Sequence, residues 1–420
     1  MSENSRSYIS PQMVREALAN TPQVTFEVTN ACNLNCFYCA YGTLYGDYGS
    51  HGSQFLSVDR VRSLIDYLAE LWQSDANKSY SQNVYISFYG GEPLLNSKLI
   101  RWIVNYIESL YCPTRLFTFG MTTNALLIPD NIDFLVEHRV RLLISLDGDR
   151  QASSYRTDVN GNDVFDRIIQ NVELIQNDYP EYFRDCVSFN AVLHNRNSVP
   201  EILRFFDQRF GKIPSIGELN GSGVAPNMQQ VYNKIYRSKS ESYDNEALTP
   251  KVWSMDDPMY HAATLYLMAN SPFAYSNYNE LIYGKTTAVN NEDTPCATCV
   301  PFSRKVYVTV SGDILPCERI SPRFSLGRIT EDFTCPNYQL ISDIYNDYYC
   351  NMSHQCRLCY HRKNCTQCMF YIKGLGTEKY PRCHQYMSEK EELQYVSDIL
   401  IFLRDHPEVY MQIMTDTLIK

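Results

Sequence analysis

The sequence has 420 residues, of which 44% are hydrophobic, and its formal net charge is −10 at pH 7. This length and apolar content allow a barrel-sized core with a smaller second domain. The acidic balance argues against nucleic acid as a partner, because nucleic-acid-binding proteins favour a basic footprint. Residues 1–22 lack the apolar run of a signal peptide, and no stretch of about 18 apolar residues is available to span a membrane. We therefore expect a cytoplasmic protein with no membrane partner.

Strand-like and helix-like segments alternate from residue 23 to about residue 220. The segments that read as strands are Val24–Thr29, Val84–Tyr89, Leu116–Met121, Arg141–Leu146, Cys186–Leu193 and Ile213–Leu219. The helices expected between them are Ser57–Trp72, Ser97–Leu110, Pro129–Glu137, Asp163–Gln176 and Val199–Phe210. This alternation predicts parallel βα units, and six units are too few for an eight-unit barrel. The predicted fold class is α/β, with a partial (β/α)6 TIM-like barrel.

The alternation ends at a turn-rich joint after residue 220, and cysteines then concentrate near the C-terminus. Ten of the fifteen cysteines lie between Cys296 and Cys383. Apolar residues return to helical spacing in the last segment, at Leu393, Val396, Ile399, Leu400 and Leu403. The expected domains are an N-terminal extension (1–22), the partial barrel (23–220), a helical bridge (221–295), a cysteine-rich domain (296–386) and C-terminal helices (387–420).

Three cysteines follow the first strand with three and then two intervening residues: Cys32, Cys36 and Cys39. An iron–sulfur cubane normally takes four thiolates, so such a triple can hold three irons and leave the fourth open to a small molecule. An odd number of thiols in a chain without a secretory signal favours metal ligation over disulfides. Structural zinc or free thiols are the alternative, although zinc prefers four ligands and the triple supplies three. Tyr38 precedes the third cysteine, where its ring can lie against an adenine.

A second motif, Gly90, Gly91, Glu92 and Pro93, follows the second strand. The two glycines allow the backbone to approach a ligand closely, and Glu92 is placed to accept hydrogen bonds from a ligand ammonium group. A plain strand-to-helix turn is the alternative. Its position one βα unit after the cysteine triple favours a ligand-binding turn.

With these two motifs, and with the run 144–148 at the fourth strand, the chain resembles the radical S-adenosylmethionine (SAM) superfamily from residue 23 to about residue 215. The resemblance implies SAM as cofactor, bound to a [4Fe-4S] cluster on Cys32, Cys36 and Cys39. It further implies that the cofactor-binding residues are Tyr38, Gly90, Gly91, Glu92, Thr123, Asn124, Ser145, Arg156 and Leu193. Of these, Ser145 and Arg156 would contact the ribose or carboxylate end of SAM, and Leu193 would pack near the adenine.

The C-terminal cysteines resemble the SPASM domain, an extension of radical SAM enzymes that modify peptides and proteins. The resemblance implies two auxiliary [4Fe-4S] clusters. The nearer one would be held by Cys296, Cys299, Cys317 and Cys368, and the farther one by Cys356, Cys359, Cys365 and Cys383. In SPASM domains the last closely spaced pair of cysteines usually has three intervening residues, whereas Cys365 and Cys368 have two. Cys350 is therefore an alternative to Cys368 as a ligand of the nearer cluster. A pair of zinc ribbons also suits the C-x2-C pairs, and the colour of the purified protein separates zinc from iron–sulfur clusters.

Glu318 directly follows Cys317 and is the candidate catalytic general base. Sulfatase-maturing relatives carry an aspartate at the matching position. An ordinary ion pair with Arg319 or Arg323 is the alternative interpretation.

The resemblance implies a radical SAM oxidoreductase that abstracts hydrogen from a ribosomally made peptide, which gains a cross-link or related oxidative change. An anaerobic sulfatase-maturing enzyme, which makes formylglycine, is the alternative, and a zinc-binding interaction scaffold without enzyme activity is more distant. Only 31 residues precede Cys32, so we expect the leader-binding module of many peptide maturases to be absent. The expected partners are a peptide or protein substrate, a separate leader-binding protein, and an electron donor such as flavodoxin or ferredoxin.

Overall fold

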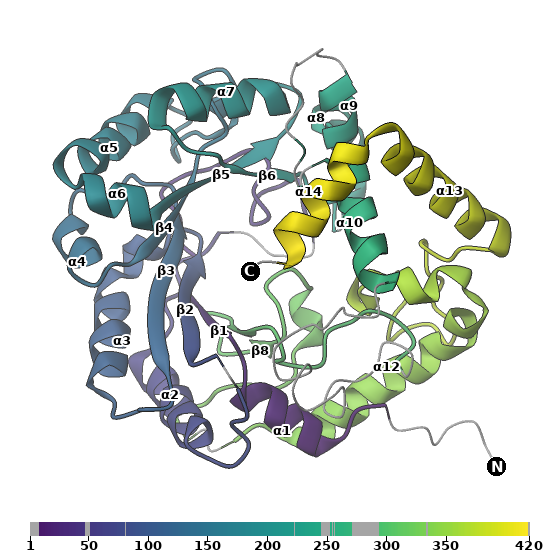
Figure 1. Ribbon diagram of the computed structural model, residues 1–420. Coiled ribbons are helices and arrows are strands. Elements are labelled where there is room, and N and C mark those ends of the chain that lie inside the picture. Colours follow the sequence, from purple (N-terminus) through teal and green to yellow (C-terminus); the bar gives the residue numbers. More distant parts are fainter. Residues whose placement is uncertain are drawn as a thin grey trace. The chain divides into compact units, whose positions relative to one another are not determined.

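The computed structural model describes most of the chain (Figure 1). The described residues are 8–46, 51–79, 81–221, 223–244, 253, 255, 257–270, 294–332 and 335–418. The chain divides into two compact units. We call Leu18–Glu246 together with Phe302–Pro336 the barrel unit, and Met1–Ala17, Ala247–Pro301 and Asn337–Lys420 the cysteine-rich unit.

Among the described residues of the barrel unit, eight strands form one sheet in the order β6-β5-β4-β3-β2-β1-β7-β8. The strands are β1 (Gln23–Thr29), β2 (Asn83–Gly90), β3 (Leu116–Thr123), β4 (Arg141–Ser145), β5 (Val187–Leu193), β6 (Ser215–Glu218), β7 (Val306–Val308) and β8 (Ile314–Leu315). Each pair of adjacent strands in this order is parallel, except that β8 is antiparallel to β7. The predicted α/β fold with six parallel strands before residue 220 is confirmed.

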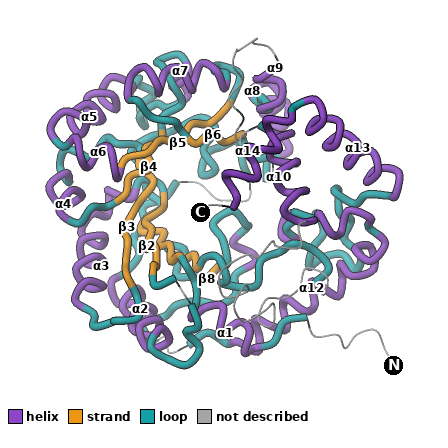
Figure 2. The backbone as a smooth tube through the Cα atoms, viewed as in Figure 1, coloured by secondary structure: helices purple, strands orange, loops and turns teal. Residues whose placement is uncertain are grey.

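Helices follow the strands and form an outer layer around them (Figure 2). They are α2 (Val58–Trp72), α3 (Ser97–Ser109), α4 (Ile132–Glu137), α5 (Phe165–Asp178), α6 (Pro180–Cys186), α7 (Val199–Phe210), α8 (Gln229–Ile235) and α9 (Lys239–Asp244). In α2 the Ser57 side chain caps the first turn by accepting from the Arg60 amide, and the apolar residues at helical spacing are buried. On β1, every residue from Val24 to Thr29 is buried, so both faces of this central strand are covered.

Strands β7 and β8 lie in residues that the sequence assigned to the cysteine-rich domain. Val306, Tyr307 and Val308 pair in parallel with β1, and a turn at Gly312 then leads into β8. We predicted no strand here, because a run of three apolar residues is too short to show a period. This short hairpin matters for function because it carries Cys317 just beyond its second strand. Helix α1 (Pro11–Ala19), which was also not predicted, precedes β1 and spans the boundary between the units.

The cysteine-rich unit contains α10 (Pro258–Asn270), α12 (Tyr338–Leu358), α13 (Glu389–Asp405) and α14 (Pro407–Leu418). Trp253, Tyr260, Ile399, Val409 and Ile413 form an apolar cluster that joins α10 to the last two helices. The expected C-terminal helices are therefore present. Their apolar face differs from the expected one, because Ile399 is buried while Leu393 is 65% and Leu400 is 51% exposed.

The expected helical bridge, residues 221–295, falls partly outside the described residues, and its described part contains α8, α9 and α10. Within the described part of the chain, no helix combines the length and apolarity needed to cross a membrane.

Candidate active site

The loop directly after β1 brings the Cys32, Cys36 and Cys39 thiols near one another. Burial raises the pKa of the Cys32 thiol to about 12, and the charges of Glu92, Cys36 and Cys39 raise it further, although the Leu34 amide opposes this by donating to the sulfur. Burial likewise raises the pKa of Cys36 to about 11. Across the described residues, no three His, Cys, Asp or Glu side chains form a ready site for a single metal ion. The structure therefore brings together three thiols of the kind that bind an iron–sulfur cluster. They do not form a ready site for a single metal ion.

Backbone hydrogen bonds hold this cysteine loop against the segment that follows β4. The Asn35 amide donates to the Thr157 carbonyl at 2.8 Å, and the Phe37 amide donates to the Tyr155 carbonyl at 3.0 Å. Cys36 lies between these two hydrogen-bonded residues, so its position depends on a segment that follows another strand, β4, of the same sheet.

The Gly90–Gly91 turn packs against the start of the same loop. The Gly91 amide donates to the Thr29 carbonyl at 3.0 Å, and the Glu92 amide donates to the Ala31 carbonyl at 2.8 Å. A Cβ atom would lie 2.0 Å from the Thr29 oxygen at Gly90 and 2.2 Å from the Ala31 oxygen at Gly91. We expected the two glycines to let the backbone approach a ligand. In this structure they instead allow it to approach the backbone of Thr29 and Ala31.

The buried Glu92 side chain connects the turn after β2 to the end of β3 by hydrogen bonds, beside the cysteine loop. Its Oε1 accepts hydrogen bonds from the Leu94 amide at 3.1 Å and the Thr123 hydroxyl at 2.8 Å. Its Oε2 accepts from the Asn124 amide at 2.8 Å, and the Asn124 side chain reaches Asn33 in the cysteine loop at 2.7 Å. Burial raises the pKa of Glu92 to about 7, against the effect of these hydrogen bonds. The predicted residues Glu92, Thr123 and Asn124 thus form one hydrogen-bonded group beside the thiols.

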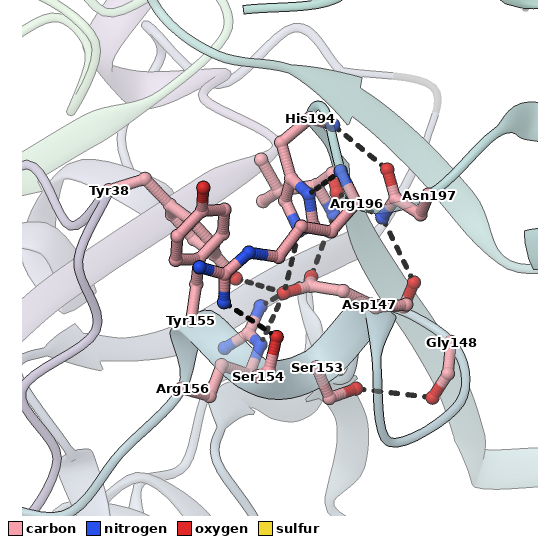
Figure 3. Close-up of polar contacts among 12 residues, drawn as sticks. Tyr38, Asp147, Gly148, Ser153, Ser154, Tyr155, Arg156, His194, Arg196 and Asn197 are labelled. Carbon is pink, nitrogen blue, oxygen red and sulfur yellow. Dashed lines mark hydrogen bonds and ion pairs between the residues drawn. The ribbon is translucent and has the colours of Figure 1, made fainter. Parts of the chain in front are cut away.

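A second buried network surrounds Asp147, which follows β4 (Figure 3). The Arg156 guanidinium donates from Nε and Nη2 to the two carboxylate oxygens, each at 2.9 Å, and the Tyr38 hydroxyl donates to Oδ2. The Val192 amide donates to Oδ1 at 2.9 Å. Burial alone would raise the pKa of Asp147, but the Arg156 charge holds it well below its ordinary range. The network therefore contains a carboxylate that remains ionised although it has no exposure to solvent.

The remaining predicted cofactor residues lie at the carboxyl ends of the same strands. Ser145 is the last residue of β4, and Leu193 is the fully buried last residue of β5. The Tyr38 ring is buried, 5.7 Å from the His194 ring and 6.2 Å from the Tyr155 ring. Ligands of parallel α/β sheets bind at this end of the strands. The sequence analysis missed Asp147 and His194, although each directly follows a predicted strand end, which was the signal available.

The candidate base Glu318 forms an ion pair in the barrel unit. Lys305 Nζ lies 2.8 Å from Glu318 Oε2, so the carboxylate is ion-paired with a lysine that the alternative interpretation did not name. The charge of Arg319, which that interpretation did name, also lowers the pKa of Glu318. Burial alone would raise the pKa of Glu318, but the Lys305 charge lowers it below its ordinary value. The Cys317 sulfur lies 3.6 Å from the same carboxylate oxygen, and burial raises the pKa of this thiol to about 11.

The thiols of the cysteine-rich unit lie within electrostatic range of one another across the two predicted ligand groups. Burial raises the pKa of Cys356, and the charges of Cys296, Cys365, Cys383 and Cys359 raise it further. Cys383 likewise lies within electrostatic range of Cys365 and Cys359. The predicted ligands Cys356, Cys359, Cys365 and Cys383 make up the first group, and Cys296 also lies within electrostatic range of Cys356 and Cys365.

The second group is Cys296, Cys299 and Cys368. Burial raises the pKa of Cys368, and the charge of Cys299 raises it further. Thr298 joins the two segments, because its hydroxyl lies 3.2 Å from the Cys296 sulfur and accepts from the Met369 amide at 2.8 Å. The fourth predicted member, Cys317, belongs to the barrel unit. The charges that shift the pKa of Cys350 are those of Asp347 and Arg357, whereas the pKa of Cys368 is affected by the thiol of Cys299.

Comparison with known proteins identifies the domain that carries the first site. Residues 26–206 match the family model of the Radical SAM superfamily. Radical SAM cyclopropyl synthase TigE of Paramaledivibacter caminithermalis is 24% identical over 241 residues, which cover 54% of this chain and 48% of that protein. A cysteine-type anaerobic sulfatase-maturating enzyme of Clostridium novyi is 25% identical over 197 residues, which cover 45% of this chain and 50% of that protein. The chain thus spans about half the length of these two relatives.

A solved structure of native anSMEcpe with bound AdoMet and Cp18Cys peptide has a similar fold. Its TM-score is 0.54 at 15% identity, and the match covers 94% of this chain and 99% of that chain. This likeness, together with the match over residues 26–206, shows that the chain contains a radical SAM domain with the partial-barrel fold.

Proposed function

We propose that this protein, which contains a radical SAM domain, is an oxidoreductase that uses SAM to modify a ribosomally made peptide or a protein. The observation that carries the proposal is the grouping of three partly buried thiols, Cys32, Cys36 and Cys39, directly after the first strand of that domain. Three thiols supply one ligand fewer than a [4Fe-4S] cluster normally takes, as required if SAM binds the fourth iron.

The residues around the thiols fit such a cluster and its cofactor. Cys32, Cys36 and Cys39 would hold the cluster, with Glu92, Thr123 and Asn124 fixing the loop on one side. When bound and reduced by an electron donor, such a cluster would supply the electron for cleavage of SAM to methionine and a 5′-deoxyadenosyl radical, which would abstract hydrogen from the substrate. Two buried residues, Tyr38 in the cysteine loop and Leu193 at the end of β5, would keep water away from the reacting atoms.

The two thiol groups of the cysteine-rich unit support two auxiliary [4Fe-4S] clusters. Cys356, Cys359, Cys365 and Cys383 make a complete set of four thiols for one of them. Cys296, Cys299 and Cys368 would supply three thiols for the other. Cys368 is favoured over Cys350 because its electrostatic neighbour is the predicted ligand Cys299.

Glu318 is proposed as the base that takes a proton from the oxidised substrate. Its ion pair with Lys305 keeps the carboxylate deprotonated at neutral pH, the state in which a base must begin. A substrate that approaches Glu318 would displace the Lys305 ammonium, and the freed carboxylate would then be more basic.

A peptide or protein substrate is supported by the names of the related proteins. The anSMEcpe structure contains bound AdoMet and the Cp18Cys peptide, and the Clostridium novyi relative is a cysteine-type anaerobic sulfatase-maturating enzyme. The second candidate function is therefore anaerobic sulfatase maturation. Glu318 favours the first candidate, because sulfatase-maturing enzymes resemble this chain but carry aspartate at the matching position.

The test begins with anaerobic reconstitution and an assay of 5′-deoxyadenosine released from SAM under a chemical reductant. The Cys36→Ala variant should lose this activity and keep the absorbance of the auxiliary clusters, while Cys112→Ala, a buried cysteine outside the groups, should keep both. Persistent 5′-deoxyadenosine in Cys36→Ala would contradict the proposal, as would a colourless protein that binds zinc.

The substrate is tested by co-expression with a short peptide encoded beside this gene, and separately with a sulfatase peptide. Loss of the mass of two hydrogens per site in the encoded peptide supports an oxidative modification. Conversion of a serine or cysteine of the sulfatase peptide to formylglycine supports the second candidate instead.

A further inference from the structure

We infer that the exposed surface beside Cys359 and Cys383 is a docking site for an acidic protein that carries single electrons. We call it the basic surface, and it is formed by Arg357, Leu358, Tyr360, Arg382 and Tyr386. The inference rests on the proposed function, in which Cys359 and Cys383 are ligands of one auxiliary cluster. It identifies where the electron donor of that reaction binds.

The part of the chain that contains the basic surface is strongly positive, although the whole chain has a formal net charge of −10. Residues 354–388 contain one acidic residue, Glu378, and six basic ones. The basic residues are Arg357, Arg362, Lys363, Lys373, Lys379 and Arg382. Across the described residues, Arg357 and Arg382 form no ion pair, and both are exposed. A positive region of this kind attracts and orients an acidic partner, which the acidic remainder of the chain would repel.

The acidic first turn of α13 follows this region, but two of its three carboxylates already have partners. Glu392 lies 2.6 Å from His361, and Glu391 accepts hydrogen bonds from the amide and the hydroxyl of Ser388. These two carboxylates are therefore engaged away from the arginines of the basic surface.

Large apolar side chains are exposed among the positive charges. Leu358 and Tyr360 are each 57% exposed, and Tyr386 is 40% exposed. Exposed apolar side chains that lie together mark interaction sites, and aromatic residues and arginine are enriched in protein interfaces. The composition of the basic surface therefore suits a protein partner better than a small anion.

Hydrogen bonds show that the basic surface is built from two adjoining segments, residues 355–360 and 381–387. The Tyr386 hydroxyl donates to the Leu358 carbonyl at 3.2 Å, and the Tyr360 amide donates to the Met387 carbonyl at 3.1 Å. The side chain of Gln355 donates to the Pro381 carbonyl and accepts from the Cys383 amide at 3.0 Å. The exposed residues of the two segments therefore belong to one surface.

Two of the proposed cluster ligands alternate with these exposed residues. Cys359 lies between Leu358 and Tyr360, Cys383 directly follows Arg382, and both cysteines are partly exposed. The Met387 amide donates to the Cys359 sulfur at 3.4 Å, which ties this thiol to the second segment. A protein bound to the basic surface would therefore come close to a cluster held by these thiols.

This closeness favours an electron carrier over an acidic peptide, which would match the charge equally well. Electron transfer between two proteins requires their redox centres to approach, whereas peptide binding does not. Complexes of electron-transfer proteins also need only a small interface. A reduced carrier bound here would give up one electron to the cluster, and no bond would be made or broken.

The experiment measures the binding of a purified acidic flavodoxin to the reconstituted protein by calorimetry, at about 0.05 M and about 0.5 M salt. The double variant Arg357→Gln/Arg382→Gln should weaken binding about tenfold at the lower salt and much less at the higher salt, because the lost contacts are electrostatic. Leu358→Ala should weaken binding at both, because salt does not screen an apolar contact. The matched control, Arg184→Gln/Arg404→Gln, removes the same charge from two exposed ion pairs and should bind like the wild type.

The inference is overturned if flavodoxin fails to bind the wild type, or binds the Arg357→Gln/Arg382→Gln variant equally well at the lower salt. It is also overturned if that variant loses affinity only for an acidic precursor peptide encoded beside this gene, since the surface would then be a peptide site. Release of 5′-deoxyadenosine from SAM with dithionite, which needs no carrier protein, tests the proposed function separately. A wild type that binds flavodoxin at this surface but releases none with dithionite would refute the proposed function and not the docking site.

Discussion

Lys305 Nζ lies 2.8 Å from Glu318 Oε2, so the carboxylate beside Cys317 is ion-paired and partly buried. A lysine thirteen positions earlier in the chain holds the candidate base in its deprotonated form. This pair makes both the stability of the barrel unit and the acid limb of the proposed reaction depend on Lys305.

We expect Lys305→Gln to destabilise the protein by about 1 kcal/mol at pH 7. The pKa of Glu318 is lowered in the folded state, so its contribution is present above the ordinary value of 4.5 and is lost as the pH falls through the folded pKa. Urea unfolding should therefore separate variant and wild type at pH 7 and bring them together at low pH. Arg404→Gln, which breaks an exposed pair with Asp405, should change little at either pH.

Lys305→Gln should also change the pH dependence of substrate modification. Without the lysine charge, burial dominates and the pKa of Glu318 rises, so the acid limb of the rate should move to higher pH. The rate of peptide modification measured across this range checks the shift. An unchanged acid limb would remove Glu318 as the base.

Gly91→Ala should displace the cysteine loop. The new methyl group would lie 2.2 Å from the Ala31 oxygen and 3.0 Å from Cys32 Cβ, so the backbone must move. We expect a loss of about 1–3 kcal/mol in the free energy of unfolding and a lower iron content after reconstitution. Gly217→Ala is the control, because its methyl group would meet only one atom at 4.0 Å. Equal iron content in the two variants would show that the loop tolerates the movement.

Glu92→Gln should weaken the hydrogen bonds around this side chain and reduce the pH dependence of the free energy of unfolding. An amide nitrogen placed at Oε2 would face the Asn124 amide, donor against donor, which costs about 1–3 kcal/mol. Burial raises the pKa of Glu92 to about 7, so the wild type loses stability as the pH rises from below the ordinary value of 4.5 through about 7. Thermal unfolding across this range should show a smaller decline in Glu92→Gln, and an equal decline would contradict the assignment.

Cys368→Ala and Cys350→Ala should differ in iron content. Cys368 lies within electrostatic range of Cys299, whereas Asp347 and Arg357 act on Cys350, so only the first substitution should remove a cluster of about four irons. Iron and sulfide analysis of the two reconstituted variants makes the comparison. Loss of iron in Cys350→Ala alone would reverse the assignment.

The sequence by itself determined the features that depend on local spacing. The alternation of short apolar runs with helical periods predicted six parallel strands, because side-chain burial follows the period of each element. The intervals between Cys32, Cys36 and Cys39 indicated the chemistry of the first site, because thiols this close in sequence can meet in one loop. The Gly90–Gly91 motif was also visible, although its contact with the Ala31 backbone was not.

Only the tertiary structure decided which distant residues act on these motifs. Asp147 contacts Tyr38 across more than a hundred positions, and Glu27 on β1 receives the Val310 amide of the β7–β8 turn, because parallel pairing brings distant strand ends to one edge. These contacts have no local period, and their residue types occur throughout the chain. Which carboxylate remains charged, and which cation faces it, depends on burial and register, and these exist only once the sheet has formed.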